Sequence, residues 1–473
     1  MSLSQSLSAA VSGLTAASRG AQVVATNLAN LRTEGFGRRD MSLTSLTGGG
    51  VLANAVLRTS TPLITADRRN AQAEAQAQGT QADFLQSLEG WLGTPGTAGA
   101  LTTRINAFGA ALTSAAAAPS SEASLTGVLD GARGLATALG DISGRIQQAR
   151  STADRSIAAD VASLNDSLAQ VADLNRSIVK MTASGRDASA LVDQRQVLVD
   201  RIAEVVPLRE VQRENGQIAL YSSGGATLLD GQPASFGFSQ AGMIAADSGP
   251  LSGLMLNGRP VSAGEGGVMA GGRMEANFAI RDDLGPAAQR QMDAIARDLM
   301  TRMEAADSTR GIAAGLFTDA GQPFDLAREV GLAARLSVNA AVDPARGGDL
   351  WRLRAGVGAT DPGDSGDGSL LGALAAALDA PQPAASGDFL PGSRSLSGLA
   401  AEFLSGTATT RLAMESASAV AASRSTTLTA LEAESGVDSD REMQLLLMIE
   451  RAYEANTKVI QAVDGMLASL LEI

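Results

Sequence analysis

Apolar residues recur at alternating steps of four and three near both ends of the chain. The N-terminal series is Leu3, Leu7, Ala10, Leu14, Ala17, Ala21, Val24, Leu28 and Leu31. The C-terminal series is Leu446, Ile449, Tyr453, Asn456, Ile460, Val463, Leu467 and Leu470. Such steps average about 3.5 residues, which is the spacing of a coiled-coil seam. Chain ends usually carry polar residues, so two apolar seams predict terminal helices that pair with each other or with neighbouring subunits.

The pattern between the two ends is helical, then β-rich, then helical again. Helical spacing covers residues 67–92 and most of 100–205, with a break near Pro119, and it returns at 286–306, 369–379 and 396–473. Residues 208–275 contain alternating runs and many Gly, Ser and Asn residues, which is typical of short strands. Short strands are also expected at 335–339 and 349–353. The predicted fold is mainly α with a β-rich central insertion (α+β), an elongated multidomain rod with its N- and C-terminal helices paired.

These patterns divide the chain into six segments. We expect an N-terminal helix and connector at 1–66, the first half of a helical rod at 67–205, a β-rich outer part with a returning helix at 206–355, an exposed loop with a short helix at 356–395, the second half of the rod at 396–434, and a C-terminal helix at 435–473.

Composition narrows the possible partners. The chain has 473 residues, a net charge of −13 and only 3% aromatic residues, so its cores are expected to be built from aliphatic side chains. An acidic chain is a poor ligand for nucleic acid or for an anionic membrane surface. We find no run of about 18 apolar residues, so no membrane-spanning helix is expected.

Catalytic and metal-binding patterns are weak. The chain has neither Cys nor His, which removes disulfides, Cys/His zinc sites and His-based catalysis. The carboxylate pairs Asp282–Asp283 and Glu432–Glu434 fit helix-surface charge better than paired-acid catalysis. Asp361, Asp364 and Asp367 do not match an EF-hand loop and are interpreted as a solvated acidic loop. We therefore expect no enzymatic activity, no cofactor and no metal.

Motifs at both ends carry a resemblance to a known family. Val11-Ser-Gly-Leu14, Thr26-Asn-Leu-Ala-Asn30 and Thr33-Glu-Gly-Phe36 resemble the N-terminal signature of bacterial flagellar axial proteins. Ser435-Gly-Val-Asp438, Glu442-Met443 and Ala452 to Asn456 resemble the C-terminal signature of the same family. Thr26 stands where this family usually has Ser, which is a mild departure.

The middle of the chain narrows this resemblance to the hook-associated proteins of the hook–filament junction. The similar segments are Leu191-Val-Asp-Gln-Arg195 with Leu198-Val-Asp-Arg201, Gly271-Gly272 with Arg281-Asp282, Gly315-Leu-Phe-Thr-Asp319, Ser337-Val-Asn339 and Asp343-Pro344. The alternative is the second hook–filament junction protein or a flagellin-like filament subunit, but the Asp-Gln-Arg segment argues against both. From other classes, a glycan-acting insertion within 205–355 stays open, and a secreted effector is disfavoured by the paired terminal seams.

The resemblance implies a structural, non-enzymatic component of the bacterial flagellum that serves flagellum assembly and motility. It implies secretion by the flagellar type III export apparatus to an extracellular place at the hook–filament junction. The implied partners are further copies of itself in a ring at the hook tip, the hook protein, the second junction protein and a cytoplasmic export chaperone that binds the C-terminal helix, with no nucleic acid and no membrane insertion.

The terminal segments would then form the inner tube of the axial structure as a coiled-coil homo-oligomer. Asn456 would either fix the register of its seam, as a polar core residue can, or face solvent. The expected assembly interface comprises Leu3, Leu7, Leu14, Val24, Asn27, Leu28, Asn30, Leu446, Ile449, Tyr453, Asn456, Ile460, Val463, Leu467 and Leu470.

Overall fold

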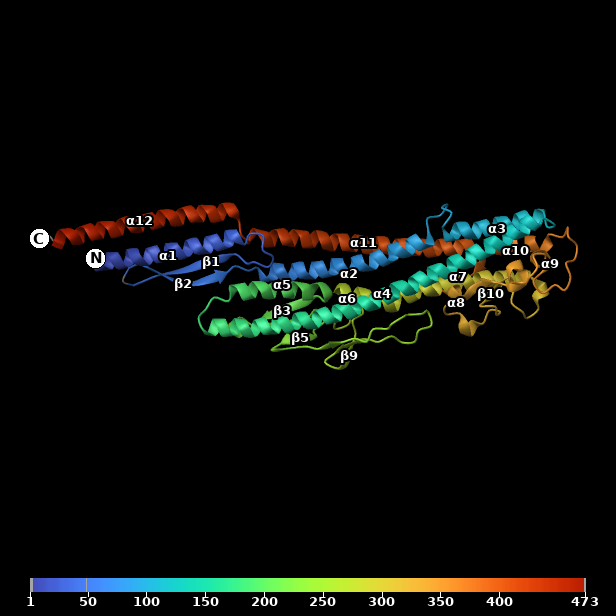
Figure 1. Cartoon of the computed structure of the whole chain (residues 1–473), viewed down its shortest axis with the longest axis horizontal. Helices are drawn as coiled ribbons and strands as arrows, with labels where there is room; N and C mark the ends of the chain where they lie inside the picture. The colour runs from blue at the N-terminus through green and yellow to red at the C-terminus, as the bar shows by residue number, and fades with distance from the viewer. Residues whose placement is uncertain (1–2, 48, 472–473) are drawn as a thin grey trace.

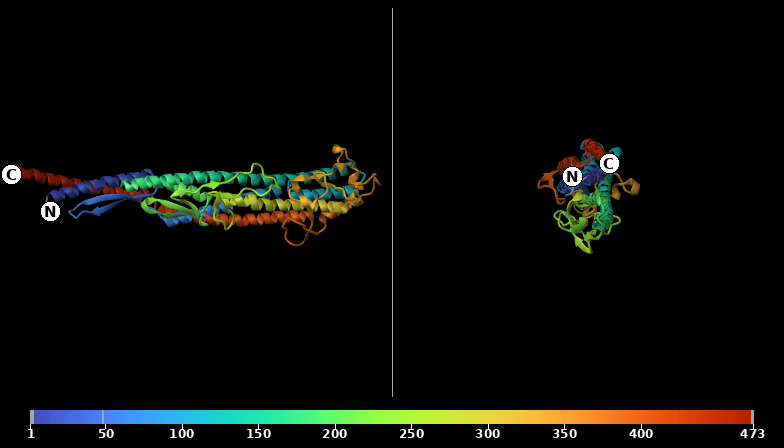
Figure 2. Two further views of the ribbon diagram at one scale, coloured as in Figure 1. Left: turned by 90° about the horizontal axis from the view of Figure 1, so that it is seen from below. Right: turned by 90° about the vertical axis from the view of Figure 1, so that its left-hand side faces the viewer.

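The molecule is a long rod with both chain ends at one tip (Figure 1). A computed structural model describes residues 3–47 and 49–471. The end-on view in Figure 2 shows a narrow cross-section, with the long helices running parallel to the main axis. Within the described residues, no helix combines the length and the apolar character that crossing a membrane requires.

Most of the rod is helical. The long helices are α1 (Leu3–Ala29), α2 (Pro62–Leu92), α3 (Leu101–Ala117), α4 (Glu122–Ala183), α5 (Ser189–Val205), α7 (Gly285–Ala306), α11 (Leu396–Glu434) and α12 (Ser439–Leu471). The shorter helices are α6 (Gly272–Ala279), α8 (Leu332–Arg335), α9 (Arg352–Ala355) and α10 (Ser369–Asp379). A π-helical turn at Ile280–Leu284 joins α6 to α7.

The strands form small antiparallel sheets. β1 (Arg39–Ser45) and β2 (Val51–Arg58) make a hairpin beside α1. The central sheets contain β3 (Leu208–Gln212), β4 (Ile218–Ser222), β5 (Thr227–Asp230) and β6 (Gln232–Pro233) in one, and β7 (Phe236–Gly237), β8 (Leu254–Leu256) and β9 (Arg259–Val261) in the other. Two further pairs are β10 (Phe317–Asp319) with β11 (Leu336–Val338), and β12 (Gln382–Pro383) with β13 (Ser393–Arg394).

The helix α4 supports both hydrophobic cores of the rod. At 62 residues and 1.5 Å per residue it is about 90 Å long. Its N-terminal half packs with α2, α3, α7, α10 and α11 in one core, whereas its C-terminal half packs with α5, α6 and the central sheets in the other. The Ser121 hydroxyl caps its start by accepting from the Ser124 amide, which satisfies a free backbone donor. A single helix therefore aligns the two cores along one axis.

The structure confirms the predicted fold class and the pairing of the terminal helices. Helix α10 covers the 11 residues from Ser369 to Asp379, as its spacing predicts. The strand expected at 349–353 is wrong, because the chain there turns into α9. That segment is short, and Leu350 and Leu353 meet the main core from a helical turn instead of from alternate sides of a strand.

Candidate assembly interface and its joint with the rod

Helices α1 and α12 lie side by side at the tip of the rod (Figures 1 and 2). Small residues on α1 allow this close approach. A Cβ on Gly13 would lie 2.7 Å from the side chain of Asn456, and a Cβ on Gly20 would lie 3.1 Å from Ile449. Val24 of α1 and Val463 of α12 are buried. The seams predicted at the two termini therefore meet within one chain.

Only part of the predicted interface is used by this pairing. Val24, Asn27 and Val463 are buried, and Leu3, Leu7, Leu14, Asn30, Leu446, Ile449, Asn456 and Ile460 are half-buried. The exposed members are Leu28, Tyr453, Leu467 and Leu470. The structure thus brings most predicted residues together and leaves the others open to solvent.

Asn456 faces α1 where it passes Gly13. Its Nδ2 donates to the Ala452 carbonyl oxygen of its own helix at 2.8 Å. In the single chain this amide therefore fills the space opposite a glycine instead of pairing with a second polar side chain.

A second stripe on α12, which the sequence analysis does not identify, is exposed along its whole length. Its members are Met448, Ala452, Ala455, Val459, Ala462 and Met466. They recur at steps of four and three, so they share one helix face. The spacing of this stripe is present in the sequence, but the more strongly apolar seam from Leu446 to Leu470 overlaps it. α12 therefore presents one apolar face to α1 and another to solvent.

A buried ion pair links the N-terminal segment to the C-terminal helix α12. Glu442 of α12 is 0% exposed. Its carboxylate accepts from Arg38 Nε at 2.8 Å and from Asn27 Nδ2 at 3.1 Å. Asn27 also bridges to the backbone of Arg39, donating to the carbonyl oxygen and accepting from the amide, each at 2.9 Å. Residues from the N- and C-terminal motifs thus form one polar cluster.

The connector after α1 touches the rod at Asp193 of α5. The Asp193 carboxylate accepts from Arg58 Nε at 2.7 Å, from Arg39 Nη2 at 3.1 Å and from the Gly37 amide at 3.0 Å. Gly35 has a φ of 74° and lies against α5, where a Cβ would come within 3.0 Å of the Asp193 carbonyl oxygen. A glycine is required there by both the conformation and the close approach.

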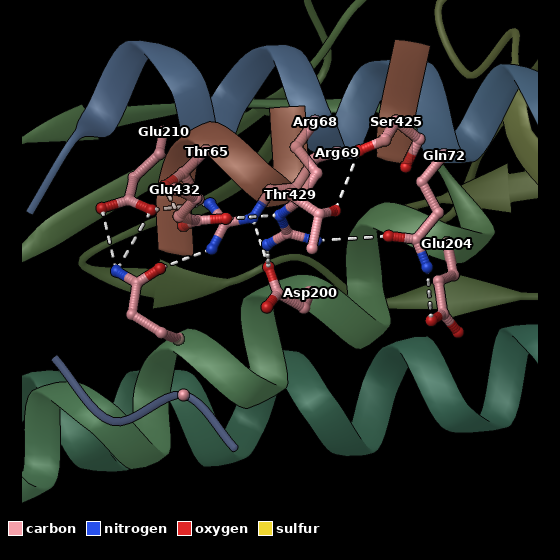
Figure 3. Close-up of polar contacts among 12 residues, drawn as sticks. Thr65, Arg68, Arg69, Gln72, Asp200, Glu204, Glu210, Ser425, Thr429 and Glu432 are labelled. Atoms are coloured by element: carbon pink, nitrogen blue, oxygen red, sulfur yellow. Dashed lines mark hydrogen bonds and ion pairs between the residues drawn. The ribbon is translucent and has the colours of Figure 1, made fainter. Parts of the chain in front are cut away.

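A second polar cluster lies immediately beyond this contact, where α2, α5, β3 and α11 converge (Figure 3). Arg68 binds Asp200 at 3.0 Å and Glu432 at 2.7 Å. Arg69 binds Asp200 at 2.5 Å and Glu210 at 3.1 Å, although its side chain is only 3% exposed. Because two arginines share Asp200, the cluster ties three helices and a strand together.

Two buried arginines of the central motifs, Arg281 and Arg195, have structural partners. Arg281 is buried and binds Asp154 at 2.7 Å, and its guanidinium lies against the rings of both Phe238 and Phe278. Arg195 donates to Asn175 Oδ1 and to the Gly216 carbonyl oxygen, both at 2.7 Å. Burial lowers the pKa of Arg195 to about 10, which still leaves it charged at neutral pH.

Five of the acidic groups considered for chemistry have structural roles. Asp361, Asp364 and Asp367 each accept from a backbone amide two residues further along the chain. Asp282 binds Arg281, and Glu432 belongs to the cluster of Figure 3. Among the described residues, no group of acidic side chains is arranged to hold a metal ion.

Asn27 and the segments that contain Asp193 and Glu442 stand out in the sequence motifs. The partnership of these residues with Arg38, Arg39 and Arg58 does not. One local signal was available. Arg38 and Arg39 are adjacent at the start of a strand, where successive side chains point to opposite sides, so two different partners are expected for them.

Two protein-family models match this chain. A family model described as the flagellar hook-associated protein FlgK helical domain matches residues 85–324, just over half of the 473 residues. The chain belongs to the FlgK family of flagellar hook-associated proteins. A second model, the C-terminal segment of flagellar basal body rod FlgEFG proteins, matches residues 430–473, which contain α12.

Curated relatives of this FlgK-family chain cover it in part. Flagellar hook-associated protein 1 of Salmonella typhimurium is 25% identical over 243 residues, which are 49% of this chain and 44% of that protein. The Bacillus subtilis protein of the same name is 24% identical over 222 residues, 44% of each. The chain therefore matches less than half the length of these relatives. The solved flagellar hook junction protein FlgK from Burkholderia pseudomallei is 19% identical to this chain and superposes with a TM-score of 0.44. The match covers 54% of this chain and 46% of the Burkholderia chain.

Proposed function

We propose that this chain is a structural, non-enzymatic subunit that joins the hook to the filament of the bacterial flagellum. The observation that carries the proposal is the FlgK family match over 85–324 together with a terminal helix pair that retains an exposed apolar face. A continuous apolar stripe on an exposed helix is typical of an interaction surface. Subunits that stack through such stripes form the wall of a tube.

The residues of the predicted assembly interface are assigned to this wall. Leu28, Tyr453, Leu467 and Leu470 are exposed in the single chain, so they are free to contact a neighbouring copy. In this arrangement, segments 1–66 and 435–473 build the inner tube, 67–205 and 396–434 form the helical rod around it, and 206–355 and 356–395 lie further out.

The proposed partners follow from the place of the subunit in the axis. They are further copies of this chain in a ring at the hook tip, the hook protein below and the second hook–filament junction protein above. The proposal includes secretion through the flagellar type III apparatus to the cell exterior. It also includes a cytoplasmic export chaperone that binds the C-terminal helix, laid as an amphipathic helix in a groove.

A deletion strain tests the function. Removing the gene for this chain is expected to leave hooks without filaments and to release filament subunits into the medium, as seen by electron microscopy and by analysis of the culture supernatant. Supplying the chain from a plasmid is expected to restore filaments. Normal filaments on the deletion strain would refute the proposed function.

A further inference from the structure

In the part of the chain that the structure describes, the terminal pair and the rod share no hydrophobic core. Here the terminal pair means α1 and α12 with the hairpin β1–β2, and the rod means residues 62–434. Among the described residues, the two apolar clusters contain none before Phe84 and none after Met414. An open cleft of about 880 Å³ also lies where the two parts meet, and Arg58 and Arg195 are among its lining residues. Apolar burial therefore does not fix the angle between the two parts.

Hydrogen bonds that cross the joint converge on one carboxylate. Asp193 is 8% exposed. Its carboxylate oxygens accept hydrogen bonds from the Arg39 and Arg58 side chains and from the Gly37 amide, with donor–acceptor distances of at most 3.1 Å. The two arginine side chains come from the two strands of the hairpin, β1 and β2, and are paired in register. Two guanidinium groups directed from paired strands onto one carboxylate hold the hairpin in position and orientation, because each bond is directional.

Adjacent residues link this contact to the C-terminal helix. Arg38 binds Glu442 of α12, whereas Arg39 binds Asp193 of α5. Because successive side chains of an extended segment point to opposite sides, the docking of α12 and the docking of the hairpin on α5 share one short stretch of backbone. A displacement at one contact must displace the other.

We propose that Asp193 is the positioning residue of the joint, and that the Arg38–Arg39 dipeptide couples the terminal pair to the rod through it. The carboxylate sets the direction in which the terminal pair leaves the rod, without contributing to the core of either part. Loss of its charge leaves Arg39 and Arg58 partly buried side by side without a counter-ion. Such charges are strongly unfavourable, and they regain water only if the joint opens.

The proposal does not rest on the flagellar role, because the test uses the purified full-length chain. The chain has no cysteine, so Ser18→Cys on α1 and Ala169→Cys on α4, both exposed, give unique positions for spin labels. Pulsed electron paramagnetic resonance then measures the distribution of distances across the joint. The unsubstituted joint is expected to show a single narrow maximum.

Asp193→Asn is expected to broaden this distribution and to add a second maximum, while the thermal unfolding of the rod stays unchanged. The matched control is Asp173→Asn on α4, which removes an exposed carboxylate that pairs with Arg176 on its own helix and is expected to change nothing. Asp193→Glu keeps the charge and is expected to keep the single maximum. Adding Arg58→Gln to Asp193→Asn removes one of the two unpaired charges and is expected to narrow the distribution again.

The single variants Arg39→Gln and Arg58→Gln decide the matter if Asp193→Asn does not fold, because each is expected to broaden the distribution by itself. An unchanged distance distribution in these variants, or an equal change in Asp173→Asn, would overturn the proposal. A distance distribution for Asp193→Glu as broad as that for Asp193→Asn would also overturn the proposal. The role of Asp193 would then lie in the shape of its side chain and not in its charge.

Discussion

At the scale of single residues, arginine takes the place that aromatic residues hold in other cores. Only 3% of the residues are aromatic, and Arg195, Arg281 and Arg302 are the largest fully buried side chains. Each is paired or hydrogen-bonded: Arg302, for example, donates to Asp298 and to the carbonyl oxygen of Arg394. A sequence pattern assigns arginine to the surface, so these buried contacts were not predictable from periodicity.

Asp293 of α7 is a single residue that makes the stability of the fold depend on pH. Its carboxylate is 3% exposed and accepts from the amides of Gly331 and Ala333 and from Gln289 Nε2. Burial raises the pKa of Asp293 to about 6, from an ordinary value of 3.8. The folded state therefore binds more protons than the unfolded state between these values, so the contribution of this group to stability is lost as the pH rises through about 6.

The difference in stability between the wild type and Asp293→Asn isolates this contribution, because all other titrating groups are common to both. Relative to the variant, the wild type is expected to gain about 1 kcal/mol when the pH falls from 7 to 5. Chemical denaturation of both proteins at the two pH values measures the change. A difference that is independent of pH would show that Asp293 keeps an ordinary pKa in the folded chain.

At the scale of elements, long periodic segments were predictable and short or polar contacts were not. The spacing of four and three located α1, α12 and α10, because burial of one helix face requires it. The segment 349–353 has apolar residues at three of its five positions, and it is too short for their spacing to separate a strand from a helical turn. The joint at Asp193 escaped prediction because its partners lie 135 to 156 residues before it in sequence and carry no periodic signal.

Two neighbouring positions on α12 distinguish pairing from assembly. Val463 is 3% exposed and faces α1, whereas Leu467, one turn further along, is 39% exposed. Val463→Asp buries a charge without a partner and is expected to release α12 from α1 in the monomer. Leu467→Asp is expected to leave the monomer intact, yet to prevent its assembly at the hook tip and thereby motility.

Circular dichroism and amide hydrogen exchange measure the first effect, and swimming assays with electron microscopy measure the second. Leu14→Asp on the half-buried part of α1 is expected to behave between the two. Normal swimming by Leu467→Asp cells would remove Leu467 from the assembly interface. A lower unfolding temperature for the purified Leu467→Asp monomer would place it in the monomer's own core.

At the scale of the whole molecule, the two parts differ in what stabilises them. The rod has two hydrophobic clusters aligned by α4, whereas the terminal pair buries one narrow face and one ion pair, Arg38–Glu442. Paired helices with one open apolar face lose little on opening, so regions of this kind open at lower free energy than the core. We therefore expect the monomer to open first at the terminal pair, with the rod remaining folded.

Limited proteolysis tests this order of opening. Arg32 in the connector and Arg441 at the start of α12 are exposed, so brief trypsin treatment of the monomer is expected to cleave after both residues. This releases residues 1–32 and 442–473 and leaves the rod intact. The proposed function places neighbouring subunits over the open face of α12 in the assembled tube. Both sites are then expected to resist cleavage, because binding to the closed form suppresses local opening. Mass spectrometry of the fragments identifies the cleavage sites, and Val463→Asp is expected to accelerate cleavage at Arg441 in the monomer. Equal resistance of the monomer and the assembled tube would contradict this order, since the terminal pair would then be as stable as the rod before any neighbour covers it.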